Sequence, residues 1–192
     1  MGGRLDPGRV RPVEGGRAPF GAGRLGRVRL LRQPLPLLLG LRLHLVCTLH
    51  GLPVGFALTG AKADERQVLL GILDTDPALL ADRRGQTLIG DKNYYGHDFE
   101  ARLDEAGLRL LRPARKGEPD RPGASLFKPL RQIIESVHDT LKGQLDLEQH
   151  GGHTPAGVLV RVLQRIVALT AAIWHNDRTG QPVLRSLVAF DH

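Results

Sequence analysis

The chain has 192 residues, 41% of them apolar and 24% charged, with a formal net charge of +7 at pH 7. This length suits one domain with a core of its own. The single cysteine, Cys47, excludes a disulfide framework and a cysteine-based metal cluster, so a reducing cytoplasm is expected. No uninterrupted apolar run reaches the roughly 20 residues that cross a bilayer, so we expect no membrane partner.

The basic character is concentrated in residues 1–40. This segment has eight arginines, no lysine and two acidic residues, a net charge of +6, which leaves +1 for residues 41–192. Its Gly, Arg, Pro and Leu residues follow neither the helical nor the strand period. Residues 1–40 are therefore interpreted as an irregular basic segment, in the simplest case a disordered arm that contacts DNA phosphates.

Regular elements are predicted from residue 41 onward. Alternating residues over 41–48 and an extended run over 52–59, joined by a turn at His50-Gly51, predict a hairpin. Asp64 and Glu65 are placed to stabilise the first turn of a helix that ends near residue 73. Further helices are predicted at about 76–82, 97–106, 127–147 and 155–174, further strands at 87–91 and 108–111, and a basic Pro- and Gly-rich loop at 112–125. This order predicts an α/β fold, with a mixed sheet covered by helices.

The helix around residues 130–145 has two faces. Six apolar residues at helical spacing predict a buried stripe: Leu130, Ile133, Ile134, Val137, Leu141 and Leu145. A second, polar stripe contains Arg131, Glu135, His138 and Lys142. This stripe is either a solvated face with helical ion pairs, or a face that holds a metal ion with its glutamate and a phosphate backbone with its cations.

Asp91 follows the predicted strand at 87–91, where a carboxylate can emerge from a buried sheet. Together with Glu135 it could hold Mg²⁺, which prefers carboxylate and water oxygens. Two such ions can activate water and stabilise the leaving oxygen in phosphodiester cleavage. That design needs a third carboxylate from the first strand of the sheet, but no acidic residue lies between Glu14 and Asp64.

Residues 40–192 resemble the C-terminal part of a DDE-type transposase of bacterial insertion sequences, a family with an RNase H-like fold. G-L-R-L-H-L-V-C-T-L-H-G-L-P-V-G-F-A-L-T-G-A-K-A-D-E is similar to the second and third strands of that family. L-I-G-D-K-N-Y-Y-G resembles the motif of its second catalytic Asp, which maps to Asp91. Arg131, Glu135 and Lys142 fit its R-x3-E-x6-K signature, in which the glutamate is the third metal ligand. The tyrosine that usually precedes this signature by three residues is replaced by Lys128.

The resemblance implies Mg²⁺-dependent DNA cleavage and strand transfer, with Mn²⁺ as the alternative ion and no small-molecule cofactor. The implied partners are transposon ends, target DNA and a second copy in a homodimer, in a nucleoid-associated, cytoplasmic bacterial protein. Residues 41–175 would form a partial catalytic domain and 176–192 a C-terminal tail. The catalytic and metal-binding candidates are Asp91 and Glu135, and the DNA-binding candidates are Arg131, Lys142, Lys92, Tyr94, Arg115 and Lys116. Tyr94 and Tyr95 could instead pack in the core.

The first catalytic Asp of the family has no counterpart in a strand context here, so we expect the first strand to be missing or disordered. Shifting the reading frame of residues 4–12 by one nucleotide can spell D-S-T-P-V-E-C-G, which resembles the first motif of the family. Residues 1–40 are accordingly interpreted as sequence translated in the wrong reading frame. We expect an inactive transposase remnant; the alternatives are a non-catalytic DNA-binding remnant and another RNase H-like nuclease.

Overall fold

A computed structural model describes residues 30–38, 40–81, 85–182 and 187. The strands are β1 (Leu30–Leu38), β2 (Leu41–Cys47), β3 (Pro53–Gly60), β4 (Thr87–Ile89) and β5 (Arg109–Leu111). The α-helices are α1 (Glu65–Thr75), α2 (Pro77–Ala81), α3 (His97–Glu105), α4 (Phe127–Asp139) and α5 (Pro155–Thr179). Short helical turns follow at Ala124–Leu126, Thr140–Gln144 and Leu147–Gln149.

The five strands form one mixed sheet in the order β3-β2-β1-β4-β5. β1 pairs antiparallel with β2, and β2 pairs antiparallel with β3, through the predicted hairpin. β4 pairs parallel with both β1 and β5, which requires the helical crossovers seen between them. This is the mixed α/β sheet covered by helices that the sequence predicts, and the prediction of an α/β fold is confirmed.

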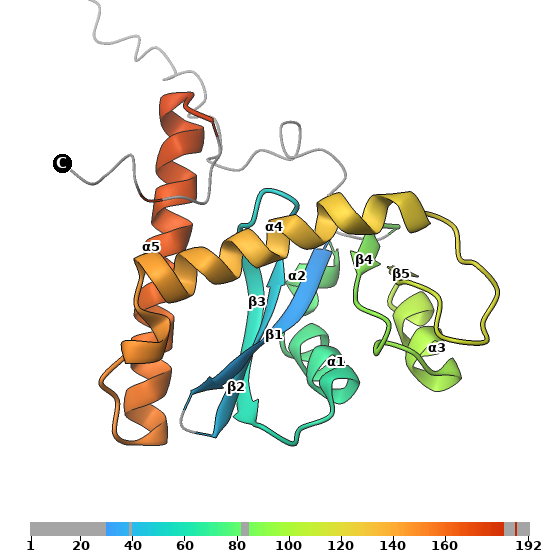
Figure 1. Cartoon of the computed structure of the whole chain (residues 1–192), viewed down its shortest axis with the longest axis horizontal. Coiled ribbons are helices and arrows are strands. Elements are labelled where there is room, and N and C mark those ends of the chain that lie inside the picture. The colour runs from blue at the N-terminus through green and yellow to red at the C-terminus, as the bar shows by residue number, and fades with distance from the viewer. Residues whose placement is uncertain (1–29, 39, 82–84, 183–186, 188–192) are drawn as a thin grey trace, which may run out of the picture.

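Helices cover both faces of the sheet, as Figure 1 shows. On one face, β2 residues such as Leu43 and Leu45 share an apolar cluster with residues of α4 and α5. On the other face, Val46 and Leu88 share a second cluster with residues of α1, α2 and α3. The alternation of Leu45 and Val46 between the two clusters follows from the two-residue period of a strand. The chain is therefore a three-layer structure with a core on each side of the sheet.

The expectation that the first strand is missing is wrong. β1 occupies the centre of the sheet, where Leu31 pairs with both Cys47 of β2 and Ile89 of β4. Prolines lack a backbone N–H and argue against a central strand. In β1 the prolines are accommodated, and the register with β2 is irregular between Leu35 and Leu38. The strand forms because backbone pairing requires no particular side chain. The part of the basic segment at residues 1–29 lies outside the described residues.

The long helix predicted over 127–147 is interrupted. α4 ends at Asp139, and a π-helical turn follows from Thr140 to Gln144. The Thr140 hydroxyl donates to the carbonyl of Ser136 at 3.1 Å, and Leu145 N donates to the Thr140 carbonyl at 3.0 Å. A π-turn has more residues than an α-turn, so the α-helical stripe predicted from Arg131 to Lys142 does not continue past α4.

Helix α5 starts with the predicted cap, in which the Thr154 side chain accepts from Gly157 N ahead of Pro155. It continues beyond the predicted end to Thr179, where Gly180 adopts a left-handed conformation (φ 71°). Its length and mean hydropathy would also allow it to cross a membrane. However, residues such as Val162 and Leu169 are fully buried against the sheet, as expected for a core helix of a globular domain.

Candidate active site at the end of strand β4

Asp91 emerges from the sheet directly after β4, as predicted. Gly90 N donates to the carbonyl of Leu111 at 3.0 Å, which extends the contact between β4 and β5 by one residue. The Asp91 carboxylate then accepts from Asn93 N at 2.7 Å, forming a turn closed by the side chain. The side chain of Asp91 is half-buried, so one oxygen is fixed by the loop and the carboxylate still reaches solvent.

Glu135 lies on α4, directly after Ile134. Ile134 is buried in the same apolar cluster as Ile89 of β4, and Asp91 follows Ile89 by two residues. The Glu135 carboxylate, 44% exposed, accepts from Arg131 Nε at 2.6 Å. Shared packing thus places the two acid-bearing segments on one face of the sheet, with Glu135 already paired to its own helix.

The carboxylates present do not make the metal site that the resemblance implies. β1, at the centre of the sheet, reads L-L-R-Q-P-L-P-L-L and contains no acid. Within the described ranges, no three His, Cys, Asp or Glu side chains are grouped so that they could hold a metal ion. Mg²⁺ usually takes one or two carboxylates together with waters and substrate phosphates, so Asp91 and Glu135 are fewer carboxylates than the three that the resemblance implies.

The predicted DNA-binding cations divide into two groups. Arg131 pairs with Glu135, and Lys142 Nζ pairs with Glu148 at 3.0 Å after the π-turn. By contrast, Lys92, Arg115 and Lys116 are exposed and form no ion pair within the described part of the chain. The cations with donors open to a ligand therefore lie in the loops that follow β4 and β5, and not on the stripe of α4.

Tyr94 does not offer its ring to a nucleotide, because only 1% of it is exposed. The ring packs in the core against Phe99, with ring centroids 6.2 Å apart. A Cβ added to Gly90 would lie 2.9 Å from Tyr94 Cδ2, so Gly90 is needed for this packing. The neighbouring Tyr95 is half-buried and is the aromatic side chain that borders the open surface beside Asp91.

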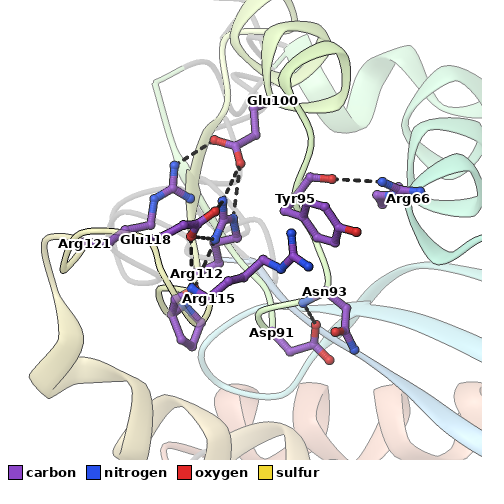
Figure 2. Close-up of polar contacts among 10 residues, drawn as sticks. Arg66, Asp91, Asn93, Tyr95, Glu100, Arg112, Arg115, Glu118 and Arg121 are labelled. Carbon is purple, nitrogen blue, oxygen red and sulfur yellow. Dashed lines mark hydrogen bonds and ion pairs between the residues drawn. The ribbon is translucent and has the colours of Figure 1, made fainter.

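The loop at 112–125 is anchored by a buried arginine, Arg112, whose burial the sequence did not predict. Arg112 is 4% exposed and donates to Glu118 at 2.7 Å and 3.0 Å, and to Glu100 at 3.0 Å and 3.2 Å (Figure 2). Arg121 also donates to Glu100, at 2.8 Å. The base of this loop is therefore tied to α3.

The same network shifts the titration of its carboxylates. The hydrogen bonds from Arg112 lower the pKa of Glu118 to about 2. Burial would raise the pKa of Glu100, but the hydrogen bonds from Arg121 and Arg112 outweigh it, and the pKa is lowered. Both residues thus remain charged across the neutral range and hold the loop in one conformation.

Asp64 caps α1 as predicted, with its carboxylate accepting from Arg66 N and Gln67 N. The side-chain hydrogen bond from Arg66 lowers the pKa of Asp64 to about 2. Arg66 also donates from Nη1 to the carbonyl of Tyr95 at 3.1 Å. The N-terminus of α1 is thereby connected to the loop that carries Asp91.

Residues 39–171 match the family described as Transposase DDE domain. Among solved structures, the catalytic core domain of BIV integrase is 19% identical with a TM-score of 0.49, over 75% of this chain and 84% of that one. A simian T-cell lymphotropic virus intasome in complex with PP2A regulatory subunit B56 gamma is 14% identical with a TM-score of 0.46, over 74% of this chain and 49% of that one. No curated protein matches. Because the family match covers more than half of its length, the chain belongs to the transposase DDE domain family.

Proposed function

We propose that this chain is a remnant of a bacterial insertion-sequence transposase that binds DNA but does not cleave it or transfer strands. The observation that carries the proposal is the set of acidic residues on this face of the sheet: Asp91 follows β4 and Glu135 lies on α4, while β1 supplies no acid. Two-metal cleavage of a phosphodiester needs both ions held in place. Loss of one shared ligand therefore removes turnover while leaving the DNA-facing surface.

If a divalent ion binds at all, Asp91 and Glu135 are the residues that would hold it, as Mg²⁺ or alternatively Mn²⁺. Such an ion would supply charge stabilisation at a scissile phosphate. The chain's own contribution would be Lys92, Arg115 and Lys116, three exposed cations in the loops that follow β4 and β5. Because phosphate contacts supply most non-specific affinity, this surface supports DNA binding without turnover.

The proposal is tested by incubating the chain with DNA that carries the terminal repeats of its element, in the presence of Mg²⁺ and then of Mn²⁺. We expect salt-sensitive binding and no cleaved or joined product. Turnover that disappears in Asp91→Ala would overturn the proposal, because it would mean that two carboxylates suffice. Cleavage without joining would instead support another RNase H-like nuclease.

The coding DNA supplies an independent test of residues 1–40. We infer that shifting the reading frame by one nucleotide upstream of codon 40 restores a transposase-like amino-acid sequence, including a D-S-T motif. Stop codons in the shifted frame, or a sequence without that motif, would contradict the inference that residues 1–40 arose by a frameshift. The remaining parts of the proposal are a homodimer and a nucleoid-associated, cytoplasmic location, which size-exclusion chromatography with light scattering and cell fractionation would check.

A further inference from the structure

We propose that Tyr95 is a positioning residue, which holds the guanidinium of Arg115 beside Asp91 as a binding site for a DNA phosphate. The inference rests on the proposed DNA-binding function. The guanidinium carbon of Arg115 lies 3.5 Å from the centroid of the Tyr95 ring, directly over its face. Figure 2 shows this stacked pair in the same loop region as Asp91 and Asn93.

Tyr95 is fixed relative to Asp91 by a short series of hydrogen bonds. The Asp91 carboxylate accepts from Asn93 N at 2.7 Å, and the Asn93 carbonyl accepts from Tyr95 N at 3.0 Å. From the other side, Arg66 donates to the Tyr95 carbonyl, and its guanidinium carbon lies 5.4 Å from the ring centroid. The ring therefore has a set position next to the carboxylate.

Arg115 is fixed at both ends. Its backbone N–H donates to Glu118 at 3.0 Å, and Glu118 is held in turn by the buried Arg112. Its guanidinium is held by the face of Tyr95, an attraction that a cation gains from the ring quadrupole. The loop thus presents Arg115 at a defined place instead of leaving it as a mobile surface charge.

Stacking leaves the chemistry of Arg115 available. A guanidinium carries its five N–H donors in its plane, and the contact with Tyr95 uses only its face. Within the described part of the chain, no acceptor is recorded for these donors, and the side chain is exposed. Planar, paired donors match the oxygens of a phosphate, and the neighbouring exposed Lys116 adds charge of the same sign.

The test uses the full chain and a short fluorescein-labelled DNA duplex, with anisotropy measured between about 50 and 200 mM NaCl. Arg115→Ala is expected to weaken binding about tenfold at the lower salt and to reduce the log–log salt slope by about one. Tyr95→Leu should give the same loss, and the double variant should be no weaker than either single one. Tyr95→Phe, which keeps the ring, should bind like the wild type.

Arg161→Ala, which removes an exposed cation from α5, is the charge-matched control and should leave affinity near wild type. Limited trypsin digestion gives a readout that needs no DNA: cleavage after Arg115 and Lys116 should accelerate in Tyr95→Leu but not in Tyr95→Phe. Wild-type affinity in Tyr95→Leu, or additive losses in the double variant, would overturn this inference alone. Failure of the wild type to bind DNA would overturn the proposed function together with it.

Discussion

The Glu135 carboxylate accepts a hydrogen bond of 2.6 Å from Arg131 Nε, one helical turn earlier on α4. Glu135, which we propose as a metal ligand, is thus already paired with a cation of its own helix. Both side chains are substantially exposed, 44% for Glu135 and 69% for Arg131, so the pair is weak and does not bury a charge.

Divalent ions are therefore expected to stabilise the folded chain very little. Ligand binding adds RT ln(1 + [L]/Kd), which stays below about 0.4 kcal/mol while the ion concentration does not exceed Kd. Thermal unfolding in Mg²⁺, in Mn²⁺ and in EDTA should give the same Tm. A saturable increase in Tm that disappears in Asp91→Asn would contradict this expectation.

The register of β1 predicts where a missing carboxylate could be restored. Leu31 pairs with Ile89, the last residue of β4, in the parallel direction, so position 33 lies two residues further along β1, toward the side of the sheet where the loop with Asp91 begins. Gln33 also pairs with Leu45, whose side chain belongs to the cluster of α4. The register therefore assigns position 33 to the α4 face of the sheet, near the end of β4.

Gln33→Asp is expected to create a Mg²⁺-dependent increase in Tm that the wild type lacks, because it adds a third carboxylate at this level of the sheet. Arg32→Asp is the matched control, since position 32 pairs with Val46 and belongs to the opposite face. Isothermal titration with Mg²⁺ checks both variants. Equal responses in the two variants would show that the register does not place a carboxylate beside Asp91.

The sequence was sufficient where local signals decide the structure. The capping residues Asp64 and Thr154, the hairpin from residue 41 to residue 60, and the position of Asp91 after a short strand all follow from neighbours in the chain. The mixed α/β arrangement followed from the order of these elements.

Features that depend on distant residues could not be predicted. β1 is held by backbone pairing with β2 and β4, so its proline-containing sequence gave no strand pattern. Arg112 gains its partners Glu100 and Glu118 only when α3 and the loop fold together. Likewise, the π-turn that directs Lys142 to Glu148 has no periodic signal that distinguishes it from a continuing α-helix.

Loss of the Arg112 side chain should destabilise the chain by about 2 kcal/mol, because its hydrogen bonds to two carboxylates are removed from a buried position. Arg112→Lys should recover little, since one ammonium cannot reproduce the planar fork of donors. Arg102→Ala breaks an ion pair with Asp74 in which both side chains are more than half exposed, and should cost under about 0.5 kcal/mol. Urea unfolding measures all three; equal losses for Arg112→Ala and Arg102→Ala would contradict the role of burial.

Acid should weaken the anchored loop in a defined pH range. The pKa of Glu118 is lowered from 4.5 to about 2 in the folded chain, so the unfolded chain binds the proton first. Its contribution to stability is complete above the unfolded pKa and is lost as the pH falls toward about 2. Glu118→Gln should flatten the decline of stability between these limits, whereas Asp120→Asn, in an exposed residue of the same loop, should not. Parallel acid-unfolding curves for wild type and Glu118→Gln would contradict this assignment.

Gly90 should tolerate no side chain, although its backbone is not strained. A Cβ at this position would lie 2.9 Å from Cδ2 and 3.2 Å from Cγ of the Tyr94 ring, which is 1% exposed and unable to move outward. Gly90→Ala should therefore cost about 1–3 kcal/mol and displace the neighbouring Asp91.

Gly71→Ala is the matched control, because position 71 lies within α1 and a Cβ there meets nothing within 4 Å. This change should stabilise the chain by up to about 1 kcal/mol, since alanine favours the helix more than glycine does. Urea unfolding followed by the fluorescence of Trp174 measures both variants. The changes in the free energy of unfolding are expected to have opposite signs for the two variants. An unchanged stability of Gly90→Ala would mean that Tyr94 is not packed as tightly against Gly90 as the structure places it.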